Sequence, residues 1–190
     1  AGTEGVLDGD ARLHLDGDEI RDFALFLLVA GNETTRNAIA QGMLALFEHP
    51  EERARLAADE SLWTTATDEI VRWTSPVRAM RRVALHDTTL GGRAIRAGDS
   101  VVMVYASANR DESVFDEPHR FRVDRDPNEH LAFGFGPHYC LGANLARMEI
   151  RAVLRSVLRR LPGIRLADGG VAVPTPSALI DGLDALPVEW

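Results

Sequence analysis

The sequence predicts a mainly α-helical fold with a smaller β part. Three stretches carry apolar residues at helical spacing: from near Asp16 to Pro50, from about 65 to 73, and from about 143 to 161. One stretch, 77–105, instead combines short β-branched runs with glycine turns. With 190 residues and a 45% hydrophobic composition, the chain is long enough to bury one domain-sized core.

The first helix begins at a clear N-terminal signal. Asp16 is a good N-cap, and Glu19 three residues later completes a capping-box pair. Pro50 ends the helical run. The middle of this helix is Ala-Gly-Asn-Glu-Thr-Thr over 30–35, which is polar and β-branched where burial should be greatest. Gly31 alone costs about 1 kcal/mol against alanine in a helix interior, so the segment indicates a function.

The remaining elements are shorter. A helix over 51–58 precedes the one at about 65–73, which Pro76 prevents from extending. A long stretch, 109–142, shows little secondary structure, and loops of this length are usually functional or disordered. The tail from 166 to 190 is expected to form short strands and turns. The expected β elements are strands over 82–85 and 101–105, with turns at 91–92 and 98–99.

Composition excludes several classes of protein. A net charge of -8 argues against nucleic-acid binding, and the longest apolar run, 23–31, is too short to span a bilayer. The single cysteine excludes an internal disulfide and the paired-cysteine metal motifs. The polar, acidic N-terminus predicts no signal peptide, so we expect a cytoplasmic protein. Because the chain starts at Ala1 without an initiator methionine, we expect a fragment of a longer protein.

The loop over 133–142 carries that cysteine directly into the last helix. Glycines at 134, 136 and 142 permit positive φ and close backbone approach. Cys140 lies just before the helix N-terminus, where backbone N–H groups and the helix dipole favour a thiolate. A thiolate in a rigid loop suits an iron centre. The alternative is a buried structural cysteine that behaves as a small apolar residue.

Four segments resemble one known family. Phe133-Gly-x-Gly-x-His-x-Cys140-x-Gly142 resembles the cysteine-ligand loop of the cytochrome P450 superfamily. The segment 30–35 resembles the family's oxygen-activating segment, Glu69-x-x-Arg72 its Glu-x-x-Arg pair, and 118–121 the Pro-x-Arg-Phe part of its meander. The resemblance is to bacterial, soluble haem-thiolate monooxygenases. It implies that residues 1–190 form the C-terminal, haem-ligating part of a single domain whose N-terminal half is absent here.

The resemblance implies that the cofactor is haem b and that Cys140 is the thiolate ligand to its iron. Thr34 then holds bound dioxygen and delivers protons, Glu33 is the acid that gates proton supply, and Ala30 and Gly31 lie against the haem. The family's helix is locally distorted at this segment, as functional helices often are. The alternative for Thr34 is a hydroxyl that bonds back to a carbonyl one turn earlier.

Further haem contacts follow from the same resemblance. Arg82 begins a segment like the family's propionate-binding strand, and His138 is the second expected propionate partner. Arg78 and Arg81 are close enough to compete for that role, and His138 has the alternative of a neutral side chain packed under the loop. Phe133 is expected beside the sulfur, where it tunes the iron's potential, and Gly134 and Gly142 allow close approach to the cofactor.

Glu69 and Arg72 lie at i, i+3 on one helical face, and Arg120 is expected to complete a buried charge network with them. The resemblance implies a structural role for the network, which locks the meander under the haem loop. The alternative is an exposed ion pair worth only about 0.3–0.5 kcal/mol.

Two surfaces complete the site. The last helix carries arginines at strict i, i+4 spacing, which are either a solvated face or a docking surface for an acidic electron donor: Arg147, Arg151, Arg155 and Arg159, with Arg160 beside them. The expected substrate pocket draws on three segments. Its residues are Leu27, Val29 and Ala30, then Pro76, Val77, Ala79 and Met80, and finally Leu179 and Ile180.

The resemblance implies a monooxygenase that inserts one oxygen atom from O2 into a C–H bond of an apolar substrate, with electrons from a ferredoxin-type donor. The strings over 30–36 and 70–77 look most like bacterial members that oxidise steroids, terpenes or branched lipids. Two alternatives stay open. One is a haem-thiolate peroxygenase or isomerase, against which the Glu33-Thr34 pair argues, and the other is a non-catalytic truncated fragment.

Overall fold

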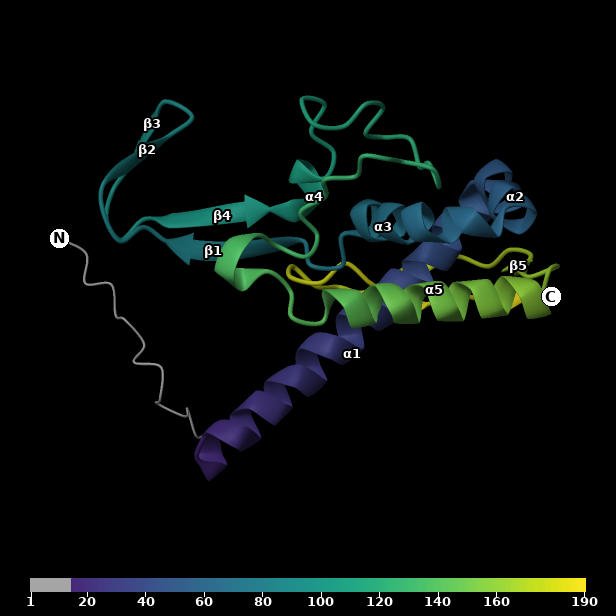
Figure 1. The fold of residues 1–190 in the computed structure, drawn as a ribbon, viewed down its shortest axis with the longest axis horizontal. Coiled ribbons are helices and arrows are strands. Elements are labelled where there is room, and N and C mark those ends of the chain that lie inside the picture. Colours follow the sequence, from purple (N-terminus) through teal and green to yellow (C-terminus); the bar gives the residue numbers. More distant parts are fainter. Residues whose placement is uncertain (1–14) are drawn as a thin grey trace.

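The computed structural model describes residues 15–190, and three of its helices pack together to form the body of the fold (Figure 1). The long helix over 17–48 crosses the other two, which span 63–74 and 143–160. Much of the irregular segment 109–142 lies on the side of the helix over 63–74 that faces away from the helix over 143–160. The helices are α1 (Gly17–Glu48), α2 (Pro50–Ala58), η1 (Glu60–Leu62), α3 (Trp63–Thr74), α4 (Tyr105–Ala108), η2 (Gly136–His138) and α5 (Ala143–Arg160).

The predicted start and end of α1 are confirmed. The Asp16 carboxylate accepts from the Asp18 and Glu19 N–H groups at 2.9 Å each, and the Glu19 carboxylate accepts from the Asp16 N–H at 2.9 Å. The helix ends at Glu48, and Pro50 begins α2 as its first residue. The expected distortion at 30–35 is wrong, because α1 continues through this segment as regular α-helix.

The core lies where the C-terminal half of α1 meets α3 and α5. A Cβ at Gly42 would lie 2.7 Å from Ile70 and 3.3 Å from Leu154, so the absence of a side chain lets the helices approach closely. The buried apolar side chains around this contact include Met43, Leu46, Ile70, Phe121, Val123, Ile150 and Leu154. The other half of α1 projects away from the body, and its apolar side chains are exposed (Figure 1).

Four two-stranded antiparallel sheets complete the fold, which confirms the predicted mainly α class with small β-sheets. The turns at 91–92 and 98–99 are confirmed, since Gly91, Gly92 and Gly98 all have positive φ. The pairs are β1 (Ala79–Val83) with β4 (Ser100–Val104), β2 (Thr88–Leu90) with β3 (Arg93–Ile95), β5 (Arg165–Leu166) with β8 (Val188–Glu189), and β6 (Val173–Pro174) with β7 (Leu183–Ala185).

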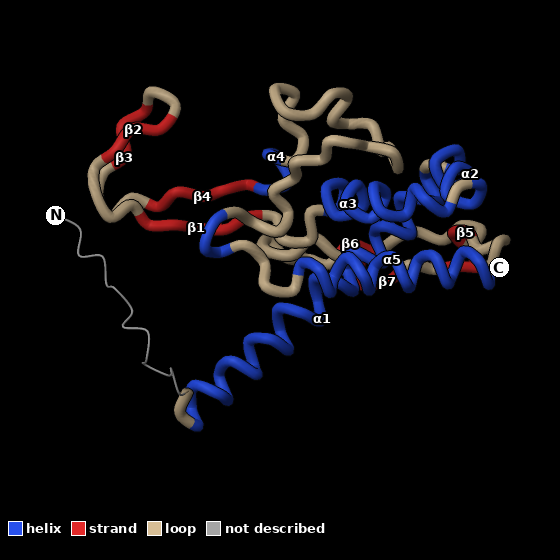
Figure 2. The backbone as a smooth tube through the Cα atoms, in the orientation of Figure 1, coloured by secondary structure: helices blue, strands red, loops and turns tan. Residues whose placement is uncertain are grey.

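The segment 109–142 is the long irregular connection that the sequence predicts, drawn almost entirely as loop in Figure 2. Its interior contains only the short η2 turn just before Cys140. Among residues 15–190, no helix combines the length and apolar character needed to cross a membrane.

Candidate functional site

The cysteine loop is held by its own backbone. The Cys140 N–H donates to the Phe133 carbonyl at 2.8 Å, and the Gly134 N–H donates to the Leu131 carbonyl at 2.8 Å. Gly134 and Gly136 have positive φ, as expected, but Gly142 does not: with φ -87° it is the ordinary N-cap of α5. Cys140 is a free, exposed thiol, so the alternative of a buried structural cysteine is wrong.

The structure brings Arg82 and His138 together. Arg82 on β1 and His138 at the end of η2 both line one hollow of about 330 Å³, together with Tyr105, Gly134 and Phe135. Arg78 is engaged elsewhere, since it pairs with Asp181 at 3.0 Å. His138 is exposed rather than packed under the loop. These two donors line one hollow, and the Cys140 thiol follows His138 by two residues on the loop, which suits a cofactor that carries carboxylates and a metal needing a thiolate.

In the polar segment 30–35 of α1, the Thr34 hydroxyl is hydrogen-bonded to the helix backbone. Thr34 Oγ1 donates to the Ala30 carbonyl at 2.7 Å, which is the arrangement named above as the alternative for this residue. The Glu33 carboxylate lies 3.8 Å from Arg36, and both side chains are about half exposed. Gly31 lines a separate hollow between α1 and α5. Within residues 15–190, Thr34 and Glu33 are therefore placed side by side on the helix, each open to a further partner.

The Glu69–Arg72 pair is fully buried, so the alternative of an exposed ion pair is wrong. Arg72 Nε donates to Glu69 Oε2 at 2.7 Å and its Nη2 to Glu69 Oε1 at 2.8 Å. Arg72 Nη1 also donates to the carbonyls of Asn109 and Pro118, at 2.7 and 2.9 Å. One guanidinium therefore ties α3 to two places in the first part of the irregular segment 109–142.

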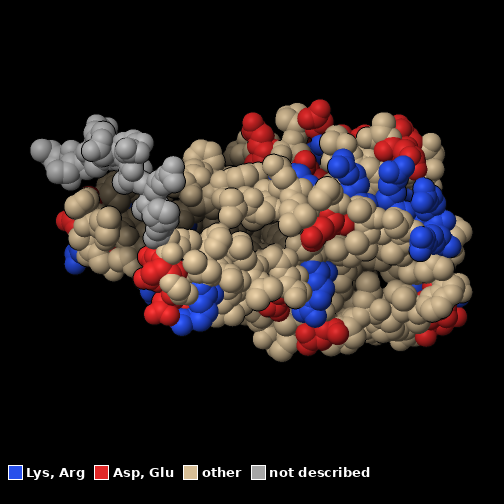
Figure 3. All heavy atoms as spheres, turned by 60° about the horizontal axis from the view of Figure 1, so that its bottom comes forward, with Lys and Arg blue, Asp and Glu red and all other residues tan. Residues whose placement is uncertain are grey.

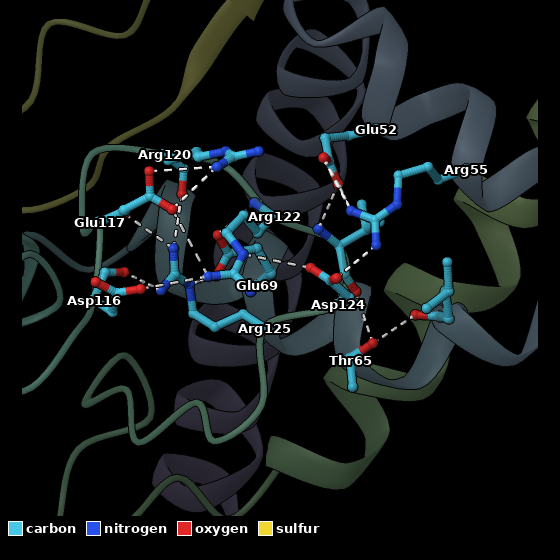
Figure 4. A network of polar contacts seen from close by, with 12 residues as sticks. Glu52, Arg55, Thr65, Glu69, Asp116, Glu117, Arg120, Arg122, Asp124 and Arg125 are labelled. Atoms are coloured by element: carbon cyan, nitrogen blue, oxygen red, sulfur yellow. Dashed lines mark hydrogen bonds and ion pairs between the residues drawn. The ribbon is translucent and has the colours of Figure 1, made fainter.

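The third member of this network is Arg125, and the prediction of Arg120 is wrong. Arg125 Nε donates to Glu69 Oε2 at 3.0 Å, and the side chain is only 4% exposed. The Arg120 side chain turns outward to Glu117 and is 60% exposed (Figure 4). Arg120 takes part only through its carbonyl, which accepts from Arg125 Nη2 at 2.8 Å. No sequence pattern pointed to Arg125, because an irregular loop has no periodicity that separates inward from outward side chains.

A second polar cluster, formed by Asp68, His130 and Arg147, lies under the cysteine loop. Arg147 Nε donates to Asp68 Oδ1 at 2.7 Å, and the His130 Nε2 lies 3.2 Å from the same oxygen. Burial disfavours the Asp68 carboxylate, but hydrogen bonds from His130 and Arg147 outweigh it and hold the pKa of Asp68 below its usual value. The Arg147 guanidinium also lies 4.5 Å from the Phe133 ring centre, so the cluster supports the loop from below.

This geometry corrects the predicted arginine stripe. Arg147 is partly buried and committed to Asp68, so it does not belong to an exposed face. Arg151, Arg155 and Arg159 are exposed, although Arg155 is in contact with Glu60. Figure 3 shows basic side chains gathered over one end of the molecule, where Figure 1 places the C-terminal half of α5.

The expected pocket segments are only partly brought together. Val77 pairs with Ile180 as an isolated antiparallel bridge, and the Arg78 N–H donates to the Leu179 carbonyl at 2.9 Å. Leu27 and Val29 lie on the projecting half of α1, where they are 45% and 62% exposed. Within residues 15–190, the structure thus joins the segments around 77 and 180 and leaves Leu27 and Val29 exposed.

Comparison with known sequences finds one family. The family model for Cytochrome P450 matches residues 61–162. The chain is 44% identical over 176 residues to the Steroid C26-monooxygenase of Mycolicibacterium smegmatis, which covers 93% of this chain and 44% of that protein. It is 48% identical over 194 residues to the Methyl-branched lipid omega-hydroxylase of Mycobacterium bovis, covering 99% of this chain and 43% of that protein. The chain spans less than half the length of these curated relatives.

Solved structures give the same result. CYP109E1 from Bacillus megaterium in complex with testosterone matches with a TM-score of 0.90 and 38% identity, over 93% of this chain and 49% of that one. Mycobacterium marinum cytochrome P450 CYP268A2 in complex with pseudoionone matches with a TM-score of 0.88 and 42% identity, over 97% of this chain and 44% of that one. The similarity in structure thus extends over nearly all of the chain.

Proposed function

Because this chain belongs to the cytochrome P450 family, we propose that residues 1–190 are the C-terminal, haem-ligating part of a single-domain monooxygenase. The full-length protein inserts one oxygen atom from O2 into a C–H bond of an apolar organic substrate. The observation that carries this proposal is the free Cys140 thiol, two residues after His138 on the glycine loop, while His138 and Arg82 of β1 line one hollow beside that loop. A thiol ligand on the loop and two carboxylate-binding donors in the adjoining hollow are what a haem with propionates requires.

The residues around the loop fit haem b. Cys140 is the thiolate ligand, while Arg82 and His138 bind the two propionates. Phe133 packs against the Arg147 guanidinium and shields the sulfur, and the glycines 134 and 142 keep bulk away from the cofactor. Ala30 and Gly31 of α1 offer a small surface on the opposite side. When bound, a haem with a thiolate ligand supplies the activation of dioxygen that C–H oxidation needs.

Thr34 and Glu33 manage protons in this proposal. The Thr34 hydroxyl, which donates to the Ala30 carbonyl, keeps its oxygen lone pairs free to accept a hydrogen bond. To pass a proton onward, its O–H has to turn away from that carbonyl, because the hydroxyl has only one hydrogen to donate. Glu33 is half exposed and lies 3.8 Å from Arg36, so its carboxylate is in contact with solvent. The two adjacent residues form the last steps of a proton path from solvent.

Steroids, terpenes and branched lipids are the proposed substrates. Two relatives support this class, since one is named a steroid monooxygenase and the other a lipid hydroxylase. The testosterone and pseudoionone bound to the two structural neighbours support it as well. The pocket uses the apolar side chains expected from the sequence. They are Leu27 and Val29 of α1, Val77, Ala79 and Met80 before and in β1, and Leu179 and Ile180 near the C-terminus.

The proposed electron donor is an acidic ferredoxin-type protein that docks on the basic face of α5. Arg151, Arg155 and Arg159 supply positive charge on a chain whose net charge is -8, so this face stands out from its surroundings. The proposed location is the cytoplasm, where a single free cysteine stays reduced.

The test is the carbon monoxide difference spectrum of the reduced full-length protein. The wild type should give the Soret band of a thiolate-ligated haem, and Cys140→Ala should lose it because no other residue of this chain offers a sulfur anion. Thr34→Ala is the control, and should keep the band. A thiolate band retained in Cys140→Ala would overturn the proposal. The same spectrum on residues 1–190 alone tests whether this part holds haem by itself.

A further inference from the structure

The C-terminal turn over 177–182 is fastened to the segment before β1. The Asp181 N–H donates to the Pro76 carbonyl at 2.8 Å, and the Arg78 N–H donates to the Leu179 carbonyl at 2.9 Å. Figure 1 draws the yellow C-terminal segment beside the start of β1. These two bonds flank the bridge between Val77 and Ile180, so the two segments behave as a short antiparallel pair.

Side chains bind the same turn to the segment before β1 again and to one further element, α1. The Asp181 carboxylate lies 3.0 Å from the Arg78 guanidinium, and Gln41 Nε2 of α1 donates to the Asp181 carbonyl at 2.7 Å. Asp181 therefore receives one contact from the segment before β1 and another from α1. Those elements, with the turn itself, are the three that carry the proposed pocket residues.

A steric contact fixes how closely the turn approaches α1. Asn37 is fully buried, and a Cβ at Gly182 would lie 2.6 Å from its amide, so only glycine fits here. Within residues 15–190, neither polar atom of the Asn37 side chain has a hydrogen-bond partner. The turn thus rests directly on α1 at Gly182, while the neighbouring Asp181 sets its direction.

We propose that Asp181, held by Arg78 and Gln41, is a positioning residue that sets where Leu179 and Ile180 stand in the substrate pocket. This inference rests on the proposed function, because it assigns selectivity to that same pocket. The Arg78 and Asp181 side chains are 41% and 35% exposed, and an ion pair this exposed contributes little to global stability. Its consequence is geometric: it chooses which carbon of an apolar substrate faces the reacting centre.

The experiment uses the full-length, haem-loaded protein and two variants, Asp181→Asn and Arg78→Gln. Each variant removes one charge of the ion pair. Testosterone and pseudoionone are the probes. Their binding is measured by the substrate-induced spin-state shift, and their oxidation by the distribution of hydroxylated products. Both variants should keep the thiolate spectrum and the melting temperature. They should redistribute product positions and weaken probe binding by about tenfold, as a small misplacement of contact groups does.

The matched control is Arg165→Gln, which breaks the Arg165–Glu189 ion pair of similar exposure in the same C-terminal part of the chain. It should leave binding and product positions unchanged. Variants of Asp181 and Arg78 with wild-type products and affinity would overturn the inference while leaving the proposed function intact. An equal effect of the control would also overturn it, because the change would then be general loosening. A wild type without the thiolate spectrum would overturn the proposed function and this inference together.

Discussion

At the scale of single residues, the Glu69 carboxylate shows how the fold sustains a buried charge. Its two oxygens accept from Arg72, Arg125 and the Arg122 N–H at 2.7–3.0 Å, and from Asn128 Nδ2 at 3.3 Å. Removing a carboxylate from water costs several kcal/mol unless charge and hydrogen bonds replace the lost hydration. The guanidinium groups of Arg72 and Arg125 and two neutral donors replace that hydration here. Both guanidinium groups also donate to loop carbonyls.

The first prediction separates Arg125 from Arg120. Arg125→Ala in the full-length protein should lower the free energy of unfolding by about 3–5 kcal/mol, because it leaves a buried carboxylate short of charge. Arg120→Ala should change it by less than about 0.5 kcal/mol, because its side chain is exposed. Urea unfolding measures both, and haem content should fall with stability in the first variant alone. Equal effects of the two substitutions would contradict the assignment of Arg125.

The second prediction concerns Thr34. Thr34→Ala should keep haem and fold, since losing its bond to the Ala30 carbonyl costs only about 0.5–1.5 kcal/mol. Product formed per reducing equivalent should fall and hydrogen peroxide release should rise, because the hydroxyl is proposed to act only after oxygen binds. Thr34→Ser, which keeps a hydroxyl, should recover most of the yield. An unchanged yield in the alanine variant would leave Thr34 with its structural bond alone.

Residue-level prediction from sequence worked where a local motif fixes geometry. The loop that presents Cys140 and His138 is held by short-range backbone bonds, so its order of residues is informative. It failed for Arg120, whose side chain pairs with Glu117 and is exposed. Arg125 is selected by how the whole loop folds over Glu69, which depends on contacts between residues 56 positions apart.

At the scale of elements, α5 has two functional parts. Its first half is tied to α3 through Arg147 and Asp68, and this pair supports Phe133 in the cysteine loop. Its second half presents Arg151, Arg155 and Arg159 to solvent. Regular i, i+4 spacing predicts that four arginines share a face, but α5 packs against α3 and its first arginine, Arg147, is partly buried in a pair with Asp68. The sequence contains the spacing, while the contact with α3 comes from tertiary packing.

The third prediction uses the lowered pKa of Asp68. A carboxylate whose pKa is depressed in the folded state stabilises the protein above its unfolded pKa of about 3.9, and that contribution is lost as pH falls through the folded value. Asp68→Asn should therefore be less stable than wild type at neutral pH, and the difference should shrink in acid below about pH 4. Thermal melts across pH measure this. Asp168→Asn, at a 91% exposed site, is the control and should track wild type.

The fourth prediction tests the basic face. Arg151→Glu combined with Arg155→Glu should slow electron transfer from an acidic ferredoxin without changing the substrate spin-state shift. Salt should slow the wild type by screening over about 8–10 Å, and should slow the variant much less. Arg93→Glu with Arg96→Glu, on and beside the exposed strand β3, is the matched control. A variant as fast and as salt-sensitive as wild type would make the stripe an ordinary solvated face.

At the scale of the whole molecule, elements were easier to predict than their assembly. Caps, proline stops and turn glycines act within a few residues, so the ends of α1 and the hairpin turns follow from the sequence. The close contact at Gly42 does not, because its partners Ile70 and Leu154 lie far along the chain. The course of the irregular segment 109–142 likewise depends on distant contacts. Arg72 donates to the carbonyls of Asn109 and Pro118, and the Asn109 side chain accepts from the Leu131 N–H.

The projecting half of α1 gives the last prediction. Its apolar side chains are 45–69% exposed: Ile20, Phe23, Leu25, Phe26, Leu27, Leu28 and Val29. A contiguous apolar surface of this kind, which runs around the helix over 25–29, favours association with another protein surface, since burying it releases ordered water. Residues 1–190 produced alone should therefore self-associate and bind a hydrophobic dye. The double variant Phe26→Gln with Leu28→Gln should do both less, as light scattering and dye fluorescence measure.

The control for that pair is Leu85→Gln with Leu90→Gln, whose side chains are 81% and 63% exposed around the β2–β3 hairpin, away from α1. These substitutions remove a similar apolar area, but from isolated positions rather than from a continuous helical surface. They should leave self-association nearly unchanged. If both pairs reduce it equally, general hydrophobicity rather than α1 drives association. If the unmodified chain stays monomeric at high concentration without binding dye, the surface is covered by other residues of the same chain.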